Sequence, residues 1–205
     1  MNSYVDFMVP VARTAEEVGQ LLHRWAAVEE PVAGDVPAVL VAHGMVCADL
    51  LAEWHSEDLE LQVAGLLHDI GLLLCPGDEL GHPAHGARYV RGLVGHRTAR
   101  LIELHVDAQC YLQRTALGYE VTPPPTASFA PQAEPMSAAA ARAFEQDPLF
   151  EAALELRRAD DAASDETVRA DAVALERQLQ RVRCLAARTR SGLVTGNGSI
   201  QPGMP

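Results

Sequence analysis

Two residue types that bind metal ions stand side by side in an apolar stretch of the sequence. His68 and Asp69 lie within the segment 63–71, whose other members are Val, Ala, Gly, Leu and Ile. A buried charge without a partner is strongly disfavoured, so such a stretch normally excludes both types. Because a cation would supply the partner, the pair predicts a metal site. Taken alone, the pair is equally compatible with a helix-terminal aspartate beside a packed histidine.

More candidate ligands lie on the inner faces of other predicted helices. The apolar periodicity directs His43, His105 and Asp160 toward the core, and His82 stands at the start of a further helix. A complete mononuclear set would consist of His43, His68, Asp69 and Asp160. His82 and Asp69 can supply the second half of a dinuclear centre. Nitrogen and oxygen donors without cysteine favour iron, manganese, cobalt, nickel or zinc over copper thiolate or iron–sulfur chemistry.

The elements that must position these residues are predicted to be helices. Hydrophobic residues make up 48% of the 205-residue chain and aromatic residues only 5%, which favours helices packed through aliphatic side chains. Thr14 and Glu17 have capping-box spacing at the first helix start. Periodicity and end signals predict helices over about 15–30, 38–55, 59–74, 83–94, 97–115 and 166–190, with two more starting near 137 and 148. The predicted fold is all-α, a single helical bundle.

Two segments differ from the helices in composition. Residues 118–135 are rich in proline and threonine, and a loop of this length in a compact domain is usually functional or mobile. It is predicted to form a lid from which Ser128 and Gln132 reach the substrate; an ordinary surface connection is the alternative. Residues 191–205 have a disorder-like composition, so the domain is predicted to span residues 1–190 and to be followed by a flexible tail.

Charge and cysteine usage narrow the class of partner. The formal net charge of −12 argues against nucleic acid or an anionic membrane as the main partner. No apolar run approaches the ~20 residues that cross a bilayer, and the first residues do not read as a secretory signal. The four cysteines form no C-x-x-C pair. A cytoplasmic protein with reduced thiols, acting on a small molecule, is expected.

The order of the candidate ligands resembles a known superfamily. His43, the His68-Asp69 pair and Asp160 follow one another as in the HD-domain superfamily, whose members are all-helical and metal-dependent. The segment 82–87 resembles the H-x-x-x-G-A segment that opens the next helix in that superfamily. His105 corresponds to the further histidine of its dinuclear members.

A more specific resemblance lies downstream. The segments 105–112, 135–137, 144–150 and 156–163 are similar to the phosphonate-degrading HD oxygenases, so the resemblance spans about residues 35–164. Those enzymes resemble inositol oxygenase in using a mixed-valent Fe(II)/Fe(III) pair to activate dioxygen. The resemblance implies two iron ions, with O2 as co-substrate and Asp69 as the bridge. The ligands that it implies are His43, His68, Asp69, His82, His105 and Asp160.

Two of these assignments have competitors nearby in the chain. His85 competes with His82, but only His82 has a glycine four residues later, Gly86, as the family pattern requires. Asp161 competes with Asp160, and the apolar stripe of the predicted helix favours Asp160.

The positions expected to contact substrate depart from the family pattern. Leu72 stands where the family has a histidine near the substrate, and Gln109 stands where it has a lysine that contacts the phosphonate. Arg157 can hold a carboxylate or phosphonate in a bidentate manner, or it can pair with Asp161 on the surface. Substrate contacts are expected from His85, Gln109, Arg157, Ser128 and Gln132.

Three functions follow as hypotheses. The first is a di-iron oxygenase that oxidises a small polar molecule, either phosphonate-type or a related hydroxylated or carboxylated compound. The second is a metal-dependent phosphohydrolase, for which the mononuclear set would suffice. The third is a binding module with a vestigial pocket, against which the retention of all six ligand positions counts.

Overall fold

The chain is entirely helical wherever its structure is described. A computed structural model describes residues 10–27, 36–116, 135–163 and 171–192, and within these ranges there is no strand. The helices are α1 (Ala15–Ala26), α2 (Val36–Trp54), α3 (Leu59–Leu67), α4 (Ile70–Leu74), α5 (His82–Val94), α6 (His96–Thr115), α7 (Ala138–Phe144), α8 (Phe150–Ala163) and α9 (Ala172–Arg190). The predicted all-α class is confirmed. The expected tail lies outside the described residues, apart from Ser191 and Gly192.

The prediction of one continuous helix over 59–74 is wrong, because the structure has two helices there, α3 and α4. α3 ends at Leu67, His68 keeps helical angles as its C-cap, and Asp69 (φ −97°, ψ 5°) leaves the helical path before α4 begins. The apolar character of the sequence continues across the break, so periodicity alone could not reveal it. The break falls at the two adjacent candidate ligands.

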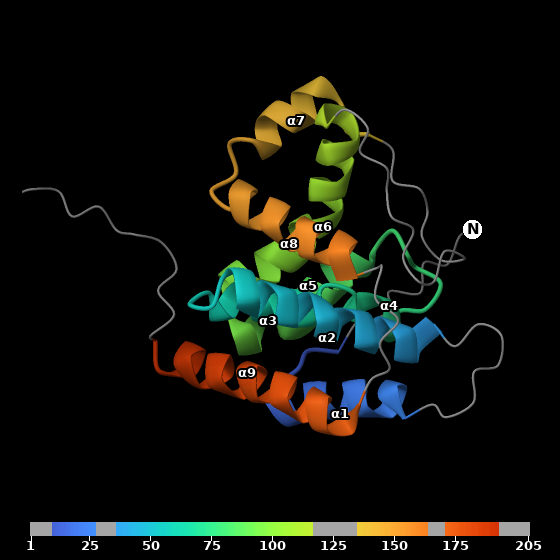
Figure 1. Cartoon of the computed structure of the whole chain (residues 1–205), viewed down its shortest axis with the longest axis vertical. Helices are drawn as coiled ribbons and strands as arrows, with labels where there is room; N and C mark the ends of the chain where they lie inside the picture. The colour runs from blue at the N-terminus through green and yellow to red at the C-terminus, as the bar shows by residue number, and fades with distance from the viewer. Residues whose placement is uncertain (1–9, 28–35, 117–134, 164–170, 193–205) are drawn as a thin grey trace, which may run out of the picture.

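The helices lie in layers, with α3 near the centre (Figure 1). α1 and α9 pack against each other on one side and contact α2, and α9 also contacts α3 and α5. On the other side of α3 lie α6 and α8, which pack against each other. α3 therefore has neighbours on both sides, which explains why every residue from Leu61 to His68 is buried.

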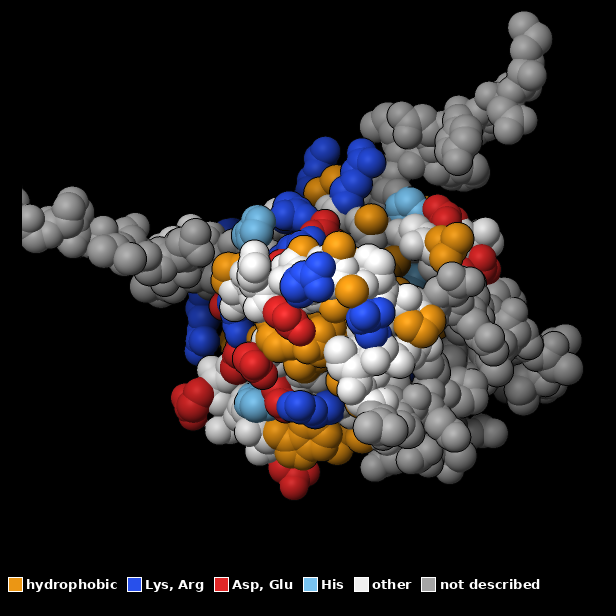
Figure 2. All heavy atoms as spheres, turned by 90° about the horizontal axis from the view of Figure 1, so that it is seen from above, with side chains coloured by type: hydrophobic (Ala, Val, Ile, Leu, Met, Phe, Trp, Pro, Cys, Tyr) orange, Lys and Arg blue, Asp and Glu red, His pale blue; other side chains and the backbone are white. Residues whose placement is uncertain are grey.

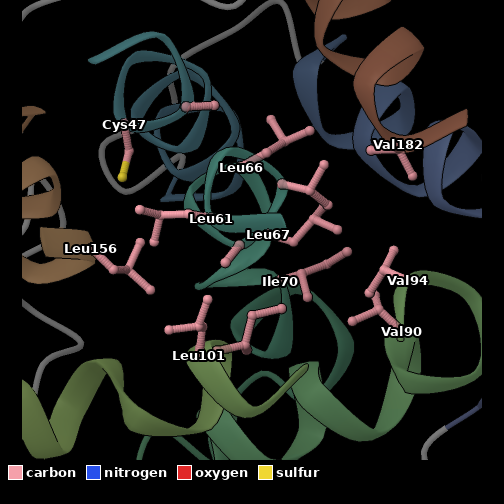
Figure 3. Close-up of a cluster of buried hydrophobic side chains, with 14 of the residues drawn as sticks. Cys47, Leu61, Leu66, Leu67, Ile70, Val90, Val94, Leu101, Leu156 and Val182 are labelled. Atoms are coloured by element: carbon pink, nitrogen blue, oxygen red, sulfur yellow. The ribbon is translucent and has the colours of Figure 1, made fainter. Parts of the chain in front are cut away.

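A continuous aliphatic core surrounds α3 (Figure 3). Leu101 of α6 and Leu156 of α8 lie on one side of Leu61 and Leu67 of α3, and Val182 of α9 lies on the other side of that helix (Figure 3); each of these side chains is at most 2% exposed. Burying a leucine or valine side chain stabilises the fold by about 1.5–3 kcal/mol. The core thus fixes the positions of the helices that carry the candidate ligands.

The end of the molecule beyond α6 and α8 is held by aromatic side chains. The ring of Tyr111 lies 5.6 Å from that of Phe144 and 5.1 Å from that of Phe150, with all three pairs in edge-to-face contact. These rings tie α7 to α6 and α8. On the surface seen from the α7 end, arginine and acidic side chains alternate with hydrophobic ones (Figure 2). None of the helices in the described ranges combines the length and apolar character needed to span a bilayer.

Side-chain caps set several helix starts. Thr14 Oγ1 accepts a hydrogen bond from Glu17 N at 3.2 Å, as the capping-box spacing predicts, while the Glu17 carboxylate accepts from Arg13 N. Asp58 caps α3 by accepting from Leu61 N at 3.0 Å, and both of its carboxylate oxygens also accept from Arg97 at 2.7 Å. The α3 cap is thereby fixed to α6.

Asp58→Asn is expected to lower the free energy of unfolding by about 1 kcal/mol at neutral pH, because it keeps the cap acceptor but loses the charge facing Arg97. Burial alone would raise the pKa of Asp58, but the Arg97 guanidinium and the Leu61 amide outweigh it and lower the pKa. A carboxyl with a lowered folded pKa stabilises the fold above its unfolded pKa of about 3.9 and loses that effect as the pH falls through the folded value. Urea titrations at pH 7 and pH 3 should therefore show the difference shrinking in acid; a pH-independent difference would contradict the ion pair.

Candidate metal centre

Six side chains from six different elements converge at the C-terminal end of α3. Their positions follow from the helices that carry them: α2 and α8 pack on each other, and α5 and α6 pack on each other. The residues are His43 (α2), His68 (C-cap of α3), Asp69 (N-cap of α4), His82 (start of α5), His105 (α6) and Asp160 (α8). The structure brings together all six residues predicted as ligands; that they bind metal stays a prediction.

One half of the cluster lies between α2, α3 and α8. His43 Nε2 lies 2.8 Å from Asp160 Oδ1. His68 Nε2 lies 3.5 Å from the same Asp160 oxygen and 3.4 Å from Asp69 Oδ2. His43, His68 and Asp69 each offer one ligand atom within 4.8 Å of the others, a spacing that a single cation could occupy.

The other half lies between α4, α5 and α6. His82 Nε2 lies 3.3 Å and His105 Nε2 3.6 Å from Asp69 Oδ1, and the two nitrogens are 3.0 Å apart. Asp69, His82 and His105 again offer three ligand atoms within 4.8 Å of one another. Asp69 thus belongs to both groups: its Oδ2 faces His68, and its Oδ1 faces His82 and His105. A carboxylate in this position suits a bridge between two cations.

Backbone carbonyls fix the orientation of three of the imidazoles. His68 Nδ1 donates to Gly65 O at 2.8 Å, His105 Nδ1 donates to Ile102 O at 2.7 Å, and His82 Nδ1 donates to Glu79 O. A carbonyl only accepts, so Nδ1 carries the proton in each ring and a neutral imidazole presents an Nε2 lone pair. A hydrogen bond from the other ring nitrogen to a backbone carbonyl is the usual support of a metal-bound histidine.

The cluster holds more acceptors than donors. The Nε2 lone pairs of His82 and His105 face each other across 3.0 Å and also face a carboxylate oxygen. His68 Nε2 is buried and has no hydrogen-bond partner among the described residues. Lone pairs and anionic oxygens repel at these distances unless protons or cations lie between them. Nitrogen and oxygen donors of this type fit iron and the other metals that accept both.

The charges of the cluster respond to one another. Burial opposes ionisation of Asp69 and Asp160, but His68 lowers the pKa of the former, and Arg157 followed by His68 lowers that of the latter, well below the usual value. Burial likewise opposes protonation of His68, yet the two carboxylates raise its pKa well above the ordinary one. At His105, burial prevails and lowers the pKa. Both carboxylates are therefore anionic, which is the form that binds a cation.

Access to solvent differs from one residue of the cluster to another. His43, His68 and His105 are at most 4% exposed, whereas the side chains of His82 and Asp69 are 12% and 16% exposed. A small molecule would therefore reach the cluster from the side of His82 and Asp69.

Two glycines permit the backbone contacts that bring the ligands together. A Cβ on Gly71 would lie 1.9 Å from the carbonyl oxygen of His82, so only glycine lets α4 approach the start of α5 this closely. A Cβ on Gly44 would lie 2.5 Å from the carbonyl oxygen of Leu66, at the crossing of α2 and α3. Gly44 directly follows the candidate ligand His43, and Gly71 comes two residues after the candidate ligand Asp69.

Arg157 lies beside the cluster and is bound by carboxylates. It is 5% exposed, donates to Asp160 Oδ2 at 2.7 Å, and also donates to Asp161 Oδ1. Gln109 Oε1 lies 3.4 Å from the same guanidinium. Of the two competing aspartates, Asp160 turns toward His43 and Asp161 toward Arg157. The pairing of Arg157 with Asp161 is present, but it is part-buried and not fully on the surface.

The remaining predicted contacts lie apart from the cluster or outside the description. His85 Nε2 pairs with Asp78 Oδ2 at 2.7 Å, away from the group that His82 joins. His82, not His85, thus lies with Asp69, in agreement with the Gly86 spacing. Ser128, Gln132 and nearly all of the predicted lid 118–135 lie outside the described residues.

The sequence analysis did not include Cys47 or the glycines as parts of the site. Cys47 follows His43 by one turn of α2, is fully buried, and lies near His68, Asp69 and Asp160, whose charges all act on it. Burial raises the pKa of its thiol to about 12, so Cys47 is a neutral neighbour of the cluster. Its position four residues after His43 was the signal in the sequence.

Comparison with known proteins adds no relative: neither a family model nor a curated protein sequence matches the chain.

Proposed function

We propose that the protein is a dinuclear metal enzyme of the HD oxygenase type, with two iron ions held by the six-residue cluster. The observation that carries the proposal is Asp69, whose two oxygens face two separate histidine groups. A mononuclear site needs no such shared carboxylate. The resemblance of the spaced sequence motifs to the mixed-valent di-iron enzymes supports iron as the metal and O2 as the co-substrate.

Several features of the chain suit redox chemistry at iron. The candidate ligands are imidazoles and carboxylates, and the nearby Cys47 thiol is kept protonated by burial, so thiolate ligation is disfavoured. When bound, a mixed-valent iron pair would supply the capacity to reduce O2 and to oxidise a substrate carbon. The deep burial of His43, His68 and His105 excludes water from one side of that reaction.

The residues around the cluster favour a substrate that is not a dianion. The Arg157 guanidinium is already bound by Asp160 and Asp161, so its charge is compensated before any substrate arrives. Its role in the proposed enzyme is to hold Asp160, through Oδ2, while Oδ1 stays turned toward the histidines. The proposed substrate is a small hydroxylated or carboxylated molecule that approaches past His82 and Asp69.

Poor turnover of aminoalkyl phosphonates is accordingly expected. Leu72 and Gln109 replace two groups that the family uses around the phosphonate, and losing a charge-assisted hydrogen bond costs about 1.5–3 kcal/mol. Two losses weaken binding by about a hundredfold or more. Oxygen uptake and phosphate release with hydroxylated aminoethylphosphonate measure this, and Leu72→His/Gln109→Lys should improve both. Rapid turnover by the unaltered protein would show that other residues replace the missing groups.

A phosphohydrolase is the second candidate, because His43, His68, Asp69 and Asp160 form a complete mononuclear group on their own. Metal analysis of protein purified without added metal, together with EPR and Mössbauer spectra, separates the two functions. Two irons per chain with a mixed-valent signal support the oxygenase. One nickel, cobalt or manganese ion per chain, with phosphatase activity, would select the hydrolase and overturn the proposal.

A further inference from the structure

A pocket of the molecule lies apart from the ligand cluster, between α9 and the turn that joins α2 to α3. Its volume is about 290 Å³, near the lower end of the range for pockets that bind small molecules. Arg177, Arg181 and Arg188 line it from α9, and Ser56 and Gln62 line it from the other side. Nothing in the proposed oxygenase function uses this pocket.

The arginines lie on one stripe of α9. Arg177, Arg181, Cys184 and Arg188 are spaced by four, three and four residues, which places them on one face of a helix, and all four line the pocket. Arg177 and Arg181 are a like-charged pair at i,i+4, which slightly destabilises a helix. The arrangement is notable in a chain whose net charge is −12.

The lining has a surplus of positive charge. Three arginines line the pocket with one carboxylate, that of Glu57, and Asp49 pairs with Arg181 from outside the lining, which leaves a surplus of one positive charge. Arg181 forms an ion pair with Asp49 at 3.0 Å and donates a hydrogen bond to Gln178. Arg177 and Arg188 have no ion-pair partner within the described residues. Two guanidiniums are therefore available to an anion from outside.

The walls of the pocket are held in place. Gln62 is 5% exposed, and its amide nitrogen donates to the backbone carbonyls of His55 and Ser56 at 2.9 and 3.0 Å. These bonds fix the α2–α3 turn against α3. On the facing side, Gln178 is buried and ties α9 to Met45 of α2. A pocket formed before binding loses less entropy when a ligand arrives.

We propose that this pocket binds a small organic anion that carries a phosphate together with a carboxylate. Guanidinium groups form paired hydrogen bonds with both groups, so the guanidiniums of Arg177 and Arg188 can each bind one of them. The overall negative charge of the chain repels long polyanions, so a small ligand is favoured over a nucleic acid. The pocket is a site separate from the metal centre, because Gln62 and His68 are six residues apart on α3, about 9 Å along the helix axis.

Isothermal titration calorimetry of the metal-loaded protein with 3-phosphoglycerate tests the proposal, with glycerate as the probe that lacks phosphate. We expect saturable 1:1 binding of 3-phosphoglycerate, at least tenfold tighter than glycerate and weaker in added salt. Arg177→Gln/Arg188→Gln should weaken binding at least tenfold. The matched control Arg88→Gln/Arg142→Gln, which removes the same charge from exposed positions outside the pocket, should change it less than twofold. Absence of binding, or equal weakening in both double variants, overturns the proposal.

Alkylation of the cysteines locates the bound anion independently. Cys184 lines the pocket and is exposed, whereas Cys110 lies near Arg157 beside the metal centre. With iodoacetamide and peptide mass spectrometry, 3-phosphoglycerate should slow the modification of Cys184 at least threefold and leave that of Cys110 unchanged. Protection of Cys110 alone would place the anion at the metal centre and refute the second site. Because metal content is not a readout in either experiment, failure of the oxygenase proposal leaves this test intact.

Discussion

His105→Ala is expected to hold one metal ion per chain instead of two and to lose oxygenase turnover, while the fold survives. His105 contacts Asp69 Oδ1 and His82, and its ring lies edge-on to that of His68 at 5.2 Å. The contacts that join His43, His68 and Asp69 Oδ2 to one another and to Asp160 do not involve His105, so this group should keep its arrangement. Substituting even the partners of metal ligands commonly costs 10–100-fold in affinity or activity, and loss of the ligand itself should reduce turnover by more than about a hundredfold.

Elemental analysis, oxygen uptake and circular dichroism measure the three parts of this result. His85→Ala is the matched control, since His85 is a neighbouring histidine that pairs with Asp78 outside the cluster, and it should keep both metals. His43→Ala should instead lose the other metal first. A His105→Ala protein that retains two metals or full turnover would make His105 a core histidine and end the dinuclear interpretation.

Gly71→Ala is expected to destabilise the fold by about 1–3 kcal/mol and to weaken the second metal group. The new Cβ would lie 1.9 Å from the His82 carbonyl oxygen, so α4 and the start of α5 must separate by more than 1 Å. His82 would then move away from Asp69 Oδ1, from which it now lies 3.3 Å. Urea unfolding and metal content per chain are the measurements.

Gly92→Ala provides the opposite control. Gly92 lies within α5, and a Cβ there would meet no atom within 4 Å. Alanine at such a position should stabilise the protein by about 0.5–1 kcal/mol, because it favours the helix and restricts the unfolded chain. If Gly71→Ala behaved like Gly92→Ala, the close approach of α4 to α5 would not be what positions His82.

The sequence predicted the helices and the convergence of the six side chains well, because periodicity reports which face of a helix is buried. His43 and His105 are buried, as the apolar periodicity of their helices predicted. The choice of Asp160 over Asp161 followed from the same kind of periodicity. The choice of His82 over His85 rested on a spacing taken from the family pattern.

Features that depend on contacts between helices could not be predicted in this way. The break at His68-Asp69 leaves the apolar pattern unchanged, and the need for glycine at Gly71 becomes visible only when the His82 carbonyl is placed against it. Whether Arg157 faces substrate or carboxylates depends equally on the packing of α8 against α2 and α6, which periodicity does not specify.

His68, His82 and His105 donate hydrogen bonds to the backbone carbonyls of Gly65, Glu79 and Ile102, and these bonds have a consequence for the metal-free protein. They hold three imidazoles with their Nε2 atoms converging, whether or not a cation is present. In the metal-free protein the two carboxylates raise the pKa of His68, so a proton takes the place of a cation there, and metal binding must displace that proton without rearranging the helices. Metal binding should accordingly appear as slower hydrogen exchange around α3 and the start of α5, a gain in local rigidity with little change of shape.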